Sequence, residues 1–293
     1  MAIDIQQYEV MDRVRTTSEL SEIVQRIKRP GEPFCTNYFI QPADAQRLID
    51  QGRMFQQVMD RVAYLLIQED DFLRLHFISR GEQPIADTLH ALSLDGQHAV
   101  VVDIPGRRDD TESISRCFRS SGFRPYAVFQ RMSRVVGSDV ATEMSDPDIV
   151  FAQIEEAPLV HQMLCHQFDK YSEHLPTCQD IETSIHQQAI LVARIDGRIG
   201  GLLYFERFGV STMLRYWLVE EAFRGHRLGA RLMHRYFNEC RNARRFMLWV
   251  DMANHNAILR YQHYGYASDG TLDNIFIINE NGARPCQASL PIS

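Results

Sequence analysis

The stretch LVEEAFRGHRLGARLM, residues 218–233, decides how the second half of the chain folds. Its apolar start reads as the end of a strand, Arg224-Gly225 as a short turn, and the remainder as the opening of a helix. Gly229 and Ala230 fall in the first helical turn, where small residues let a ligand approach the backbone. The N–H groups of such a turn, together with the helix dipole, suit a pyrophosphate. The stretch therefore predicts a phosphate-binding strand–loop–helix unit.

A second stretch, VDMANHNAILRYQHYGY at residues 250–266, has the same strand-to-helix character. It ends a strand, opens a helix at Asn254 and finishes at Gly265-Tyr266. A glycine at that point fits the C-terminus of a helix, where the backbone turns left-handed.

Together the two stretches resemble the GNAT superfamily of acyl-CoA-dependent N-acetyltransferases. The family's pyrophosphate loop reads Arg/Gln-x-x-Gly-x-Gly/Ala after its fourth strand, and this frame is filled here by Arg224, Gly225, His226, Leu228, Gly229 and Ala230. Its last helix typically reads Asn-x-x-Ala-x-x-x-Tyr-x-x-x-Gly-Phe, matched by Asn254, Ala257, Tyr261, Gly265 and Tyr266, with Tyr in place of Phe. One departure is Arg227, which stands at the first glycine of the loop, where it narrows the pocket or adds a cation for a phosphate.

The resemblance covers about residues 149–280 and implies an α/β (α+β mixed-sheet) GNAT fold with acetyl-CoA as acyl donor. In the family, strands 4 and 5 diverge and the pantetheine arm pairs with strand 4, here about Tyr216–Val219. A backbone N–H at Leu218 or Val219 would stabilise the oxyanion, and the Tyr261 hydroxyl would protonate the departing thiolate. The cofactor-binding residues implied are Leu218, Val219, Arg224, Gly225, His226, Arg227, Leu228, Gly229, Ala230, Asn254 and Ala257.

The general base stays open at this point, because the strand TMLRYWLV carries no carboxylate. Glu206, Asp251, Glu173 and His174 are the candidates, and each also reads as a solvated or structural residue. A chain of water molecules is an equal alternative. The loop KYSEHLPT, residues 170–177, occupies the place where family members hold the acceptor, and Tyr171 is expected to line that pocket.

Composition limits the classes of function. The chain has 293 residues, enough for two domains, and a formal net charge of −7, which argues against binding to nucleic acid or anionic membranes. No apolar run reaches the roughly 18–20 residues of a membrane helix, and the N-terminus has no signal-peptide pattern. The six cysteines are scattered singly, which indicates neither disulfides nor a metal site and favours a cytoplasmic protein.

Arginines are concentrated in one segment of the second half. Residues 224–245 contain seven of them (224, 227, 231, 235, 241, 244 and 245) against one acid, Glu239. They could attract the polyanionic CoA or form a solvated helix face. Trp217 and Trp249 lie on the two central strands and are expected in the core.

Periodicity and turn residues predict the elements. In the first half we expect helices over the first 30 or so residues, Pro42–Arg61, 85–94 and 110–120, a hairpin at Glu69–Asp71 and a strand at 99–105. The polar segment 136–148 is the linker candidate. The second half is expected to run β-α-α-β-β-β-α-β-α-β.

The first half shows the same strand–helix–glycine–aromatic–strand order as the end of the chain. Aligning Gly122-Phe123 with Gly265-Tyr266 puts Phe118 at the position of Tyr261, and no Arg-x-x-Gly-x-Gly loop precedes its strand. We therefore predict tandem GNAT-like domains: residues 1–140 degenerate and without a cofactor site, and residues 141–293 catalytic. A chance similarity of two α/β units is the alternative.

These features predict an N-acetyltransferase that moves an acetyl group from acetyl-CoA to a primary amine of a small-molecule or amino-acid-like acceptor. Alternatives are a protein or peptide amine as acceptor and a non-catalytic acyl-CoA-binding regulatory module. An aminoacyl-tRNA-dependent peptidyl transferase fits poorly, because the pyrophosphate loop is present and the chain is acidic. We expect no metal, nucleic-acid or membrane partner. The oligomeric state is left open, a homodimer included.

Overall fold

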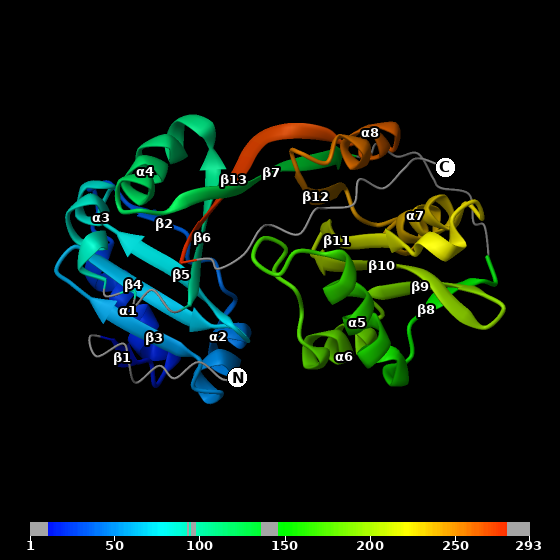
Figure 1. Ribbon diagram of the computed structural model, residues 1–293, viewed down its shortest axis with the longest axis horizontal. Coiled ribbons are helices and arrows are strands. Elements are labelled where there is room, and N and C mark those ends of the chain that lie inside the picture. The colour runs from blue at the N-terminus through cyan, green and yellow to red at the C-terminus, as the bar shows by residue number, and fades with distance from the viewer. Residues whose placement is uncertain (1–10, 93, 95–97, 136–145, 280–293) are drawn as a thin grey trace. The chain divides into compact units, whose positions relative to one another are not determined.

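The computed structural model describes residues 11–92, 94, 98–135 and 146–279 (Figure 1). They divide into two compact units, one comprising residues up to Phe129 together with those from Gly270, the other comprising Gln130–Asp269. The boundaries differ from the predicted division into 1–140 and 141–293, because a C-terminal segment belongs to the first unit. Most of the predicted linker, 136–145, lies outside the described residues.

The first unit is built on a mixed sheet with the strand order β1-β3-β4-β5-β6-β13-β7. Hairpins make β3, β4 and β5 antiparallel, whereas β5 and β6 are parallel. Its elements are β1 (Asp12–Arg13), α1 (Thr17–Ile27), β2 (Cys35–Thr36), α2 (Pro42–Asp50), β3 (Met54–Val58), β4 (Val62–Gln68), β5 (Phe72–Ser79), α3 (Gln83–Thr88), β6 (Ala99–Arg107), α4 (Arg108–Ser120) and the first part of β7 (Arg124–Val135).

Two expected helices of the first half are shorter than the sequence suggested. The first begins only at Thr17, because Thr16 caps it by accepting the N–H of Glu19. The second ends at Asp50 rather than Arg61, because Gly52 adopts a left-handed φ of +68° and the chain continues as strand β3. The hairpin predicted at residues 69–71 is present between β4 and β5.

The second unit has the strand order β7-β12-β11-β10-β9-β8, in which β7 takes part with its residues from Gln130. The predicted series β-α-α-β-β-β-α-β-α-β is confirmed element by element. In chain order the series consists of β8 (Ile149–Phe151), α5 (Ala157–Gln167), α6 (Cys178–His186), β9 (Ile190–Ile195), β10 (Arg198–Phe208), β11 (Ser211–Val219), α7 (Leu228–Glu239), β12 (Arg245–Asp251), α8 (His255–His263) and β13 (Ala267–Ile278). The residues of β13 from Gly270 belong to the first unit.

The two units repeat the same local structure after their last helices. Two residues after the end of α4 stands Gly122, with a φ of +91°, and two residues after the end of α8 stands Gly265, with a φ of +82°. In α4 the N–H of Phe123 donates to the Phe118 carbonyl at 3.1 Å, and in α8 the N–H of Tyr266 donates to the Tyr261 carbonyl at 3.0 Å. The structure thus places Phe118 and Tyr261 at equivalent positions, as the sequence alignment predicted.

Strand β13 follows α8 along the chain but completes the sheet of the first unit. Its residues Thr271–Ile278 pair antiparallel with Arg107–Val100 of β6. Three consecutive side chains of β13, those of Ile275, Phe276 and Ile277, are at most 1% exposed, and Phe276 belongs to the apolar core that contains Phe118. The core of the first unit therefore depends on the end of the chain.

This dependence leads to a prediction for the fragment of residues 1–140. Fully burying each large apolar side chain contributes about 1.5–3 kcal/mol, so losing the three of β13 removes much of a typical net stability of roughly 5–15 kcal/mol. We expect the fragment alone to lack cooperative thermal unfolding by circular dichroism, and the same fragment carrying residues 267–279 on a flexible linker to regain it. A cooperative transition for residues 1–140 alone would contradict this account.

Candidate active site

Strands β11 and β12 run parallel and separate at the centre of the second unit. Their register joins Ser211–Leu214 to Arg245–Leu248, and among the described residues it ends there, although β11 continues to Val219 and β12 to Asp251. This divergence of the two central strands is the feature that the resemblance predicted for strands 4 and 5.

A bulge in β11 coincides with the point of divergence. Tyr204 of β10 pairs with Tyr216, and the next residue, Phe205, pairs with Leu214, so Arg215 is the extra residue on β11. A bulge bends its strand and increases the local twist. The bulge therefore supplies a physical reason for β11 to leave β12 beyond Leu214.

The backbone beyond the bulge alternates between the two sides of β11. Two groups of β11 and its end face the neighbouring strand β10. The Glu220 N–H donates to the Gly200 carbonyl, and the Leu218 carbonyl lies close to Gly201. Because successive residues in a strand direct their N–H and C=O groups to opposite sides, Trp217 and Val219 direct theirs toward the divergence. Of the two predicted oxyanion residues, Val219 has the suitable direction and Leu218 has not.

The predicted pyrophosphate loop follows β11 and opens α7. Gly225 is exposed, has a φ of +91°, and has open space where a Cβ would lie. Arg227 has a left-handed φ of +56°, a conformation that glycine adopts at no steric cost. Its side chain is exposed, as is that of His226. Leu228 is buried in the core, which leaves its backbone as the part that can meet a ligand.

Helix α7 begins without a side-chain cap within the described part of the chain. Its first intrahelical bond runs from the Arg231 N–H to the Arg227 carbonyl at 3.1 Å, so the N–H groups of Leu228, Gly229 and Ala230 precede the helical ladder. Helices α6 and α8, in contrast, are capped by Thr177 and Asn254. Uncapped N–H groups beside a glycine-containing loop fit a pyrophosphate.

The arginine-rich segment is largely engaged by carboxylates. Arg231 donates two bonds to Asp146, at 2.6 and 2.7 Å, and one to Asp148 at 2.6 Å; these hydrogen bonds raise the pKa of Arg231 and lower that of Asp146. Ion pairs also join Arg224 to Glu221, Arg235 to Glu239 and Arg245 to Asp269. Arg227 is the cation best placed for a phosphate, because it is exposed within the loop itself.

Trp217 links the loop to the last helix. A Cβ on Gly229 would lie 3.1 Å from the Trp217 ring, and the same ring lies 5.7 Å from the Tyr261 ring and 5.9 Å from that of Tyr264. The Trp217 Nε1 atom is buried and has no hydrogen-bond partner among the described residues. The sequence analysis assigned Trp217 to the core. Its position between the loop and Tyr261 depends on the bulge at Arg215, which changes the direction of the side chains that follow it on β11.

Tyr261 lies on α8, partly buried against the core of the second unit. Burial and, secondly, the carboxylate of Glu173 raise the pKa of its hydroxyl, against a smaller opposite effect of Arg260. The phenol therefore stays protonated at neutral pH and can donate a hydrogen bond. Asn254 accepts the Ala257 N–H at 3.1 Å, so these two predicted cofactor residues cap the helix that carries Tyr261.

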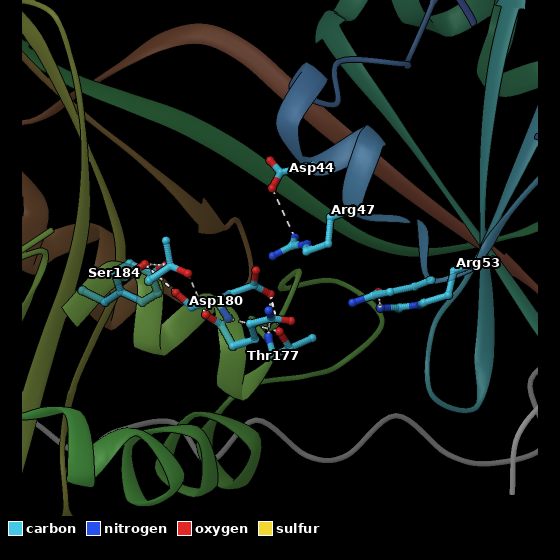
Figure 2. Close-up of polar contacts among 10 residues, drawn as sticks. Asp44, Arg47, Arg53, Thr177, Asp180 and Ser184 are labelled. Carbon is cyan, nitrogen blue, oxygen red and sulfur yellow. Dashed lines mark hydrogen bonds and ion pairs between the residues drawn. The ribbon is translucent and has the colours of Figure 1, made fainter. Parts of the chain in front are cut away.

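The loop at residues 170–177 is held at its start and at its end. The Asp169 carboxylate accepts the N–H groups of Tyr171 and Ser172 at 3.1 and 3.0 Å. At the other end, Thr177 and Asp180 form a reciprocal cap on α6, with the Thr177 hydroxyl 2.7 Å from Asp180 (Figure 2). Such fixed ends give the loop one defined course.

The middle of this loop is fastened to β11 beyond the bulge. The Tyr216 hydroxyl contacts the carbonyls of Glu173 and His174, each at 2.7 Å. The Tyr216 ring packs against Phe168 with the centroids 5.1 Å apart. Glu173 thus lies beside the diverging part of β11. Burial raises the pKa values of both Tyr216 and Tyr261, and the Glu173 carboxylate raises them further, in Tyr216 against a larger opposite effect of Arg215.

The other base candidates have contacts of a different kind. Glu206 is 3.8 Å from Arg215 in an ion pair. Asp251 is buried and accepts the Ala253 N–H at 2.9 Å in the turn that leads to α8. His174 is exposed and has a left-handed φ of +47°. Among the four, Glu173 is the candidate whose charge acts on Tyr261.

A hollow of about 400 Å³ lies between α7 and the end of α8, lined by Arg134, His234, Phe237, His263, Tyr264 and Gly265. It contains none of the predicted site residues. The strand divergence and the loop, and not this hollow, define the candidate site.

Comparison with known proteins identifies the second unit. Residues 158–266 match the model of the family described as Acetyltransferase (GNAT) family. These residues form a GNAT domain. The match includes the diverging strands, the loop and the helix with Tyr261, and the family is one of acyl-transferring enzymes. No curated protein sequence matches the chain.

Solved structures with low sequence identity share the fold of the chain as a whole. A GCN5-related N-acetyltransferase from Sphaerobacter thermophilus has a TM-score of 0.56 at 16% identity over 82% of this chain and 87% of its own. A tandem GNAT protein from the clavulanic acid biosynthesis pathway has a TM-score of 0.56 at 10% identity, over 93% and 99%. The glucosamine N-acetyltransferase region of a fungal GH3 β-N-acetylglucosaminidase reaches 0.60 at 12% identity, over 92% of this chain and 38% of that one.

These likenesses establish the architecture of two GNAT-like units in tandem. Among the described residues, no helix combines the length and the apolar character needed to cross a membrane.

Proposed function

We propose that the GNAT domain transfers an acetyl group from acetyl-CoA to the primary amine of a small-molecule or amino-acid-like acceptor. The observation that carries this proposal is the open edge of β11 next to the uncapped start of α7. The edge of β11 offers backbone groups to an extended arm that contains amides. The start of α7 offers N–H groups to a pyrophosphate. Acetyl-CoA contains both parts in one molecule.

The residues that would hold the donor follow from this arrangement. The Trp217 N–H and C=O groups and the Val219 carbonyl would pair with the pantetheine arm, which leaves the Val219 N–H for the oxyanion. The N–H groups of Leu228, Gly229 and Ala230 would bind the pyrophosphate, and the exposed Arg227 would add a positive charge. Arg231 takes no part, because Asp146 and Asp148 already engage its guanidinium.

The chemistry needs three functions near the thioester. The amine nitrogen attacks the carbonyl carbon, and the negative charge that forms on its oxygen is stabilised by the Val219 N–H. The C–S bond then breaks, and the sulfur leaves with its electron pair while the Tyr261 hydroxyl donates to it. The amine loses one proton during the attack, and a carboxylate is a suitable acceptor for it.

Glu173 is our choice for that carboxylate. Its backbone is held at β11 by Tyr216, its charge acts on the Tyr261 hydroxyl, and its negative charge favours an ammonium-bearing acceptor. Tyr216 and Asp169 act as positioning residues, because they fix the loop that carries Glu173 and have no role in the bond changes.

A steady-state assay with a panel of primary amines tests the function and the base together. We expect acetyl-CoA turnover by the full chain, and a roughly 10²-fold or larger fall in kcat for Glu173→Gln. The matched control is Glu206→Gln, which removes an equal charge from the half-buried ion pair with Arg215. It should leave kcat within about twofold, because the Glu206 carboxylate is not among the charges that act on Tyr261.

Each other outcome has a definite meaning. Binding of acetyl-CoA without turnover of any amine would contradict the enzymatic proposal and favour the regulatory module. An equal loss of kcat in Glu173→Gln and Glu206→Gln would contradict the choice of base while leaving the transferase function in place.

A further inference from the structure

The first unit contains a strand divergence like that of the GNAT domain. Strands β5 and β6 run parallel, and their register joins Phe72–Leu75 to Ala99–Val102. It ends there within the described residues, although β5 continues to Ser79 and β6 to Arg107. Four residue pairs join the parallel strands in both units. The point at which the strands separate, here called the apex of the opening, therefore follows the fourth pair.

The residues around the two openings correspond to each other. Strand β5 pairs with β4 in one unbroken register, whereas β11 carries one extra residue at its bulge. Counting from the apex, Phe77 of β5 therefore corresponds to Trp217 of β11. The ring contacts agree, because Phe77 lies 5.8 Å from Phe118 and Trp217 lies 5.7 Å from Tyr261.

In the first unit the opening is filled by the side chain of Asn37. Its Nδ2 donates to the Leu75 carbonyl on β5 at 3.1 Å and to the Asp103 carbonyl on β6 at 2.8 Å. Its Oδ1 accepts the Phe77 N–H at 2.6 Å. A single carboxamide thus joins the two strands where they part, and Asn37 is only 4% exposed.

The residues next to Asn37 run along β5 as an added strand. Cys35 and Thr36 of β2 pair antiparallel with Ser79 and Ile78, and the Asn37 N–H donates to the Phe77 carbonyl at 3.3 Å. This added strand uses the side of β5 that does not face β4. The segment Cys35–Asn37 therefore occupies, beside residues 77–79, the place that corresponds to the open edge at residues 217–219.

The remainder of the first unit lacks the features that bind a CoA pyrophosphate. The helix after β5, α3, has six residues, begins after the acidic Glu82, and carries Pro84 in its first turn. A proline removes one N–H and an acidic side chain repels a phosphate. The equivalent of Tyr261 is Phe118, which is fully buried and has no hydroxyl.

We propose that the first unit is a GNAT-like domain whose donor cleft is filled by its own residues Cys35–Asn37, with the Asn37 carboxamide in the place of a pantetheine amide. The cleft is therefore part of the core of this unit and takes no acyl-CoA. The comparison of the Asn37 carboxamide with an amide of acetyl-CoA rests on the function proposed for the second unit. The filled cleft also shows how a strand-like arm pairs with this edge, which is the pairing proposed for residues 217–219.

Hydrogen–deuterium exchange of the full chain, with and without acetyl-CoA, tests the proposal without any mutation. We expect amides of residues 76–79 to be protected without acetyl-CoA and unchanged by it, and amides of residues 215–219 to gain protection when it is added. Added protection at 76–79, or a stoichiometry of two donors per chain, would overturn the filled cleft. No change at 215–219 with residues 76–79 still protected would overturn the proposed function alone.

The variant Asn37→Ala tests the carboxamide itself. Because it removes the acceptor of the Phe77 N–H, the exchange of that amide should rise about tenfold, the effect of one net hydrogen bond. Asn37→Asp keeps an acceptor oxygen and loses both Nδ2 donors, so the Phe77 amide should exchange more slowly in it than in Asn37→Ala. Equal Phe77 exchange in Asn37→Ala and the unmodified chain would overturn the proposal. If Asn37→Ala does not fold, the exchange of the unmodified chain with and without acetyl-CoA tests the proposal by itself.

Discussion

Replacing Tyr261 with Phe should lower kcat by roughly 10²–10³, the range that a positioned acid contributes. The change removes one hydroxyl and keeps the ring, so the contacts with Trp217 and Tyr266 survive. Because burial raises the pKa of this hydroxyl, it remains protonated across the neutral range and no loss of activity from its ionisation is expected there. The loss should appear in kcat more than in KM, because the hydroxyl is needed only as the C–S bond breaks.

A pre-steady-state measurement completes this test. Slow product release would hide a slower chemical step in kcat, and a burst of product would reveal it. The control variant is Tyr264→Phe, which removes a hydroxyl from another ring that contacts Trp217 and should keep turnover within about twofold. Unchanged turnover in Tyr261→Phe without a burst would mean that the thiolate leaves unaided or through water, and that Tyr261 is a packing residue.

Replacing Gly229 with Glu should abolish acetyl-CoA binding in isothermal titration calorimetry. The new carboxylate would stand where N–H groups meet a phosphate. The structure adds a steric effect, because even a Cβ at this position lies 3.1 Å from the Trp217 ring. Gly229→Ala is the matched control, since it introduces the Cβ without the charge.

The comparison of the two variants separates charge from packing. An acidic side chain in the first turn of a helix interacts favourably with the helix dipole. Gly229→Glu should therefore unfold at a temperature no lower than Gly229→Ala, while it binds acetyl-CoA far more weakly. An affinity of Gly229→Glu within about twofold of the unmodified chain, a change of only ~0.4 kcal/mol, would refute the assignment of the loop.

Local sequence patterns carried much of the fold. The order of strands and helices in the second unit follows from periodicity and turn residues, which act between near neighbours along the chain. The equivalence of Phe118 and Tyr261 could also be predicted from the sequence, because a glycine follows both helices and fixes the alignment of the two segments. Both glycines have a positive φ in the structure. The loop frame could be found from the spacing of Arg224, Gly229 and Ala230, and Arg227 within it has a left-handed φ of +56°.

Long-range pairing decided the remainder, and no local pattern encodes it. Strand β13 reads as the last strand of the second half, yet it pairs with β6 and buries Phe276 in the first unit. Asn37 belongs to none of the sequence motifs, and it closes the opening between β5 and β6.

The candidate site shows the same limit. The bulge at Arg215 turns the Val219 N–H, and not that of Leu218, toward the opening. Tyr216 brings Glu173 to β11 from 43 residues away along the chain, and Asp146 engages Arg231 from a separation of 85 residues. The sequence by itself determined which elements form and which motifs they carry, because those depend on neighbouring residues. Only the tertiary structure decided which strand edge each segment covers and which charges meet, because many edges and carboxylates compete for each partner and packing selects among them.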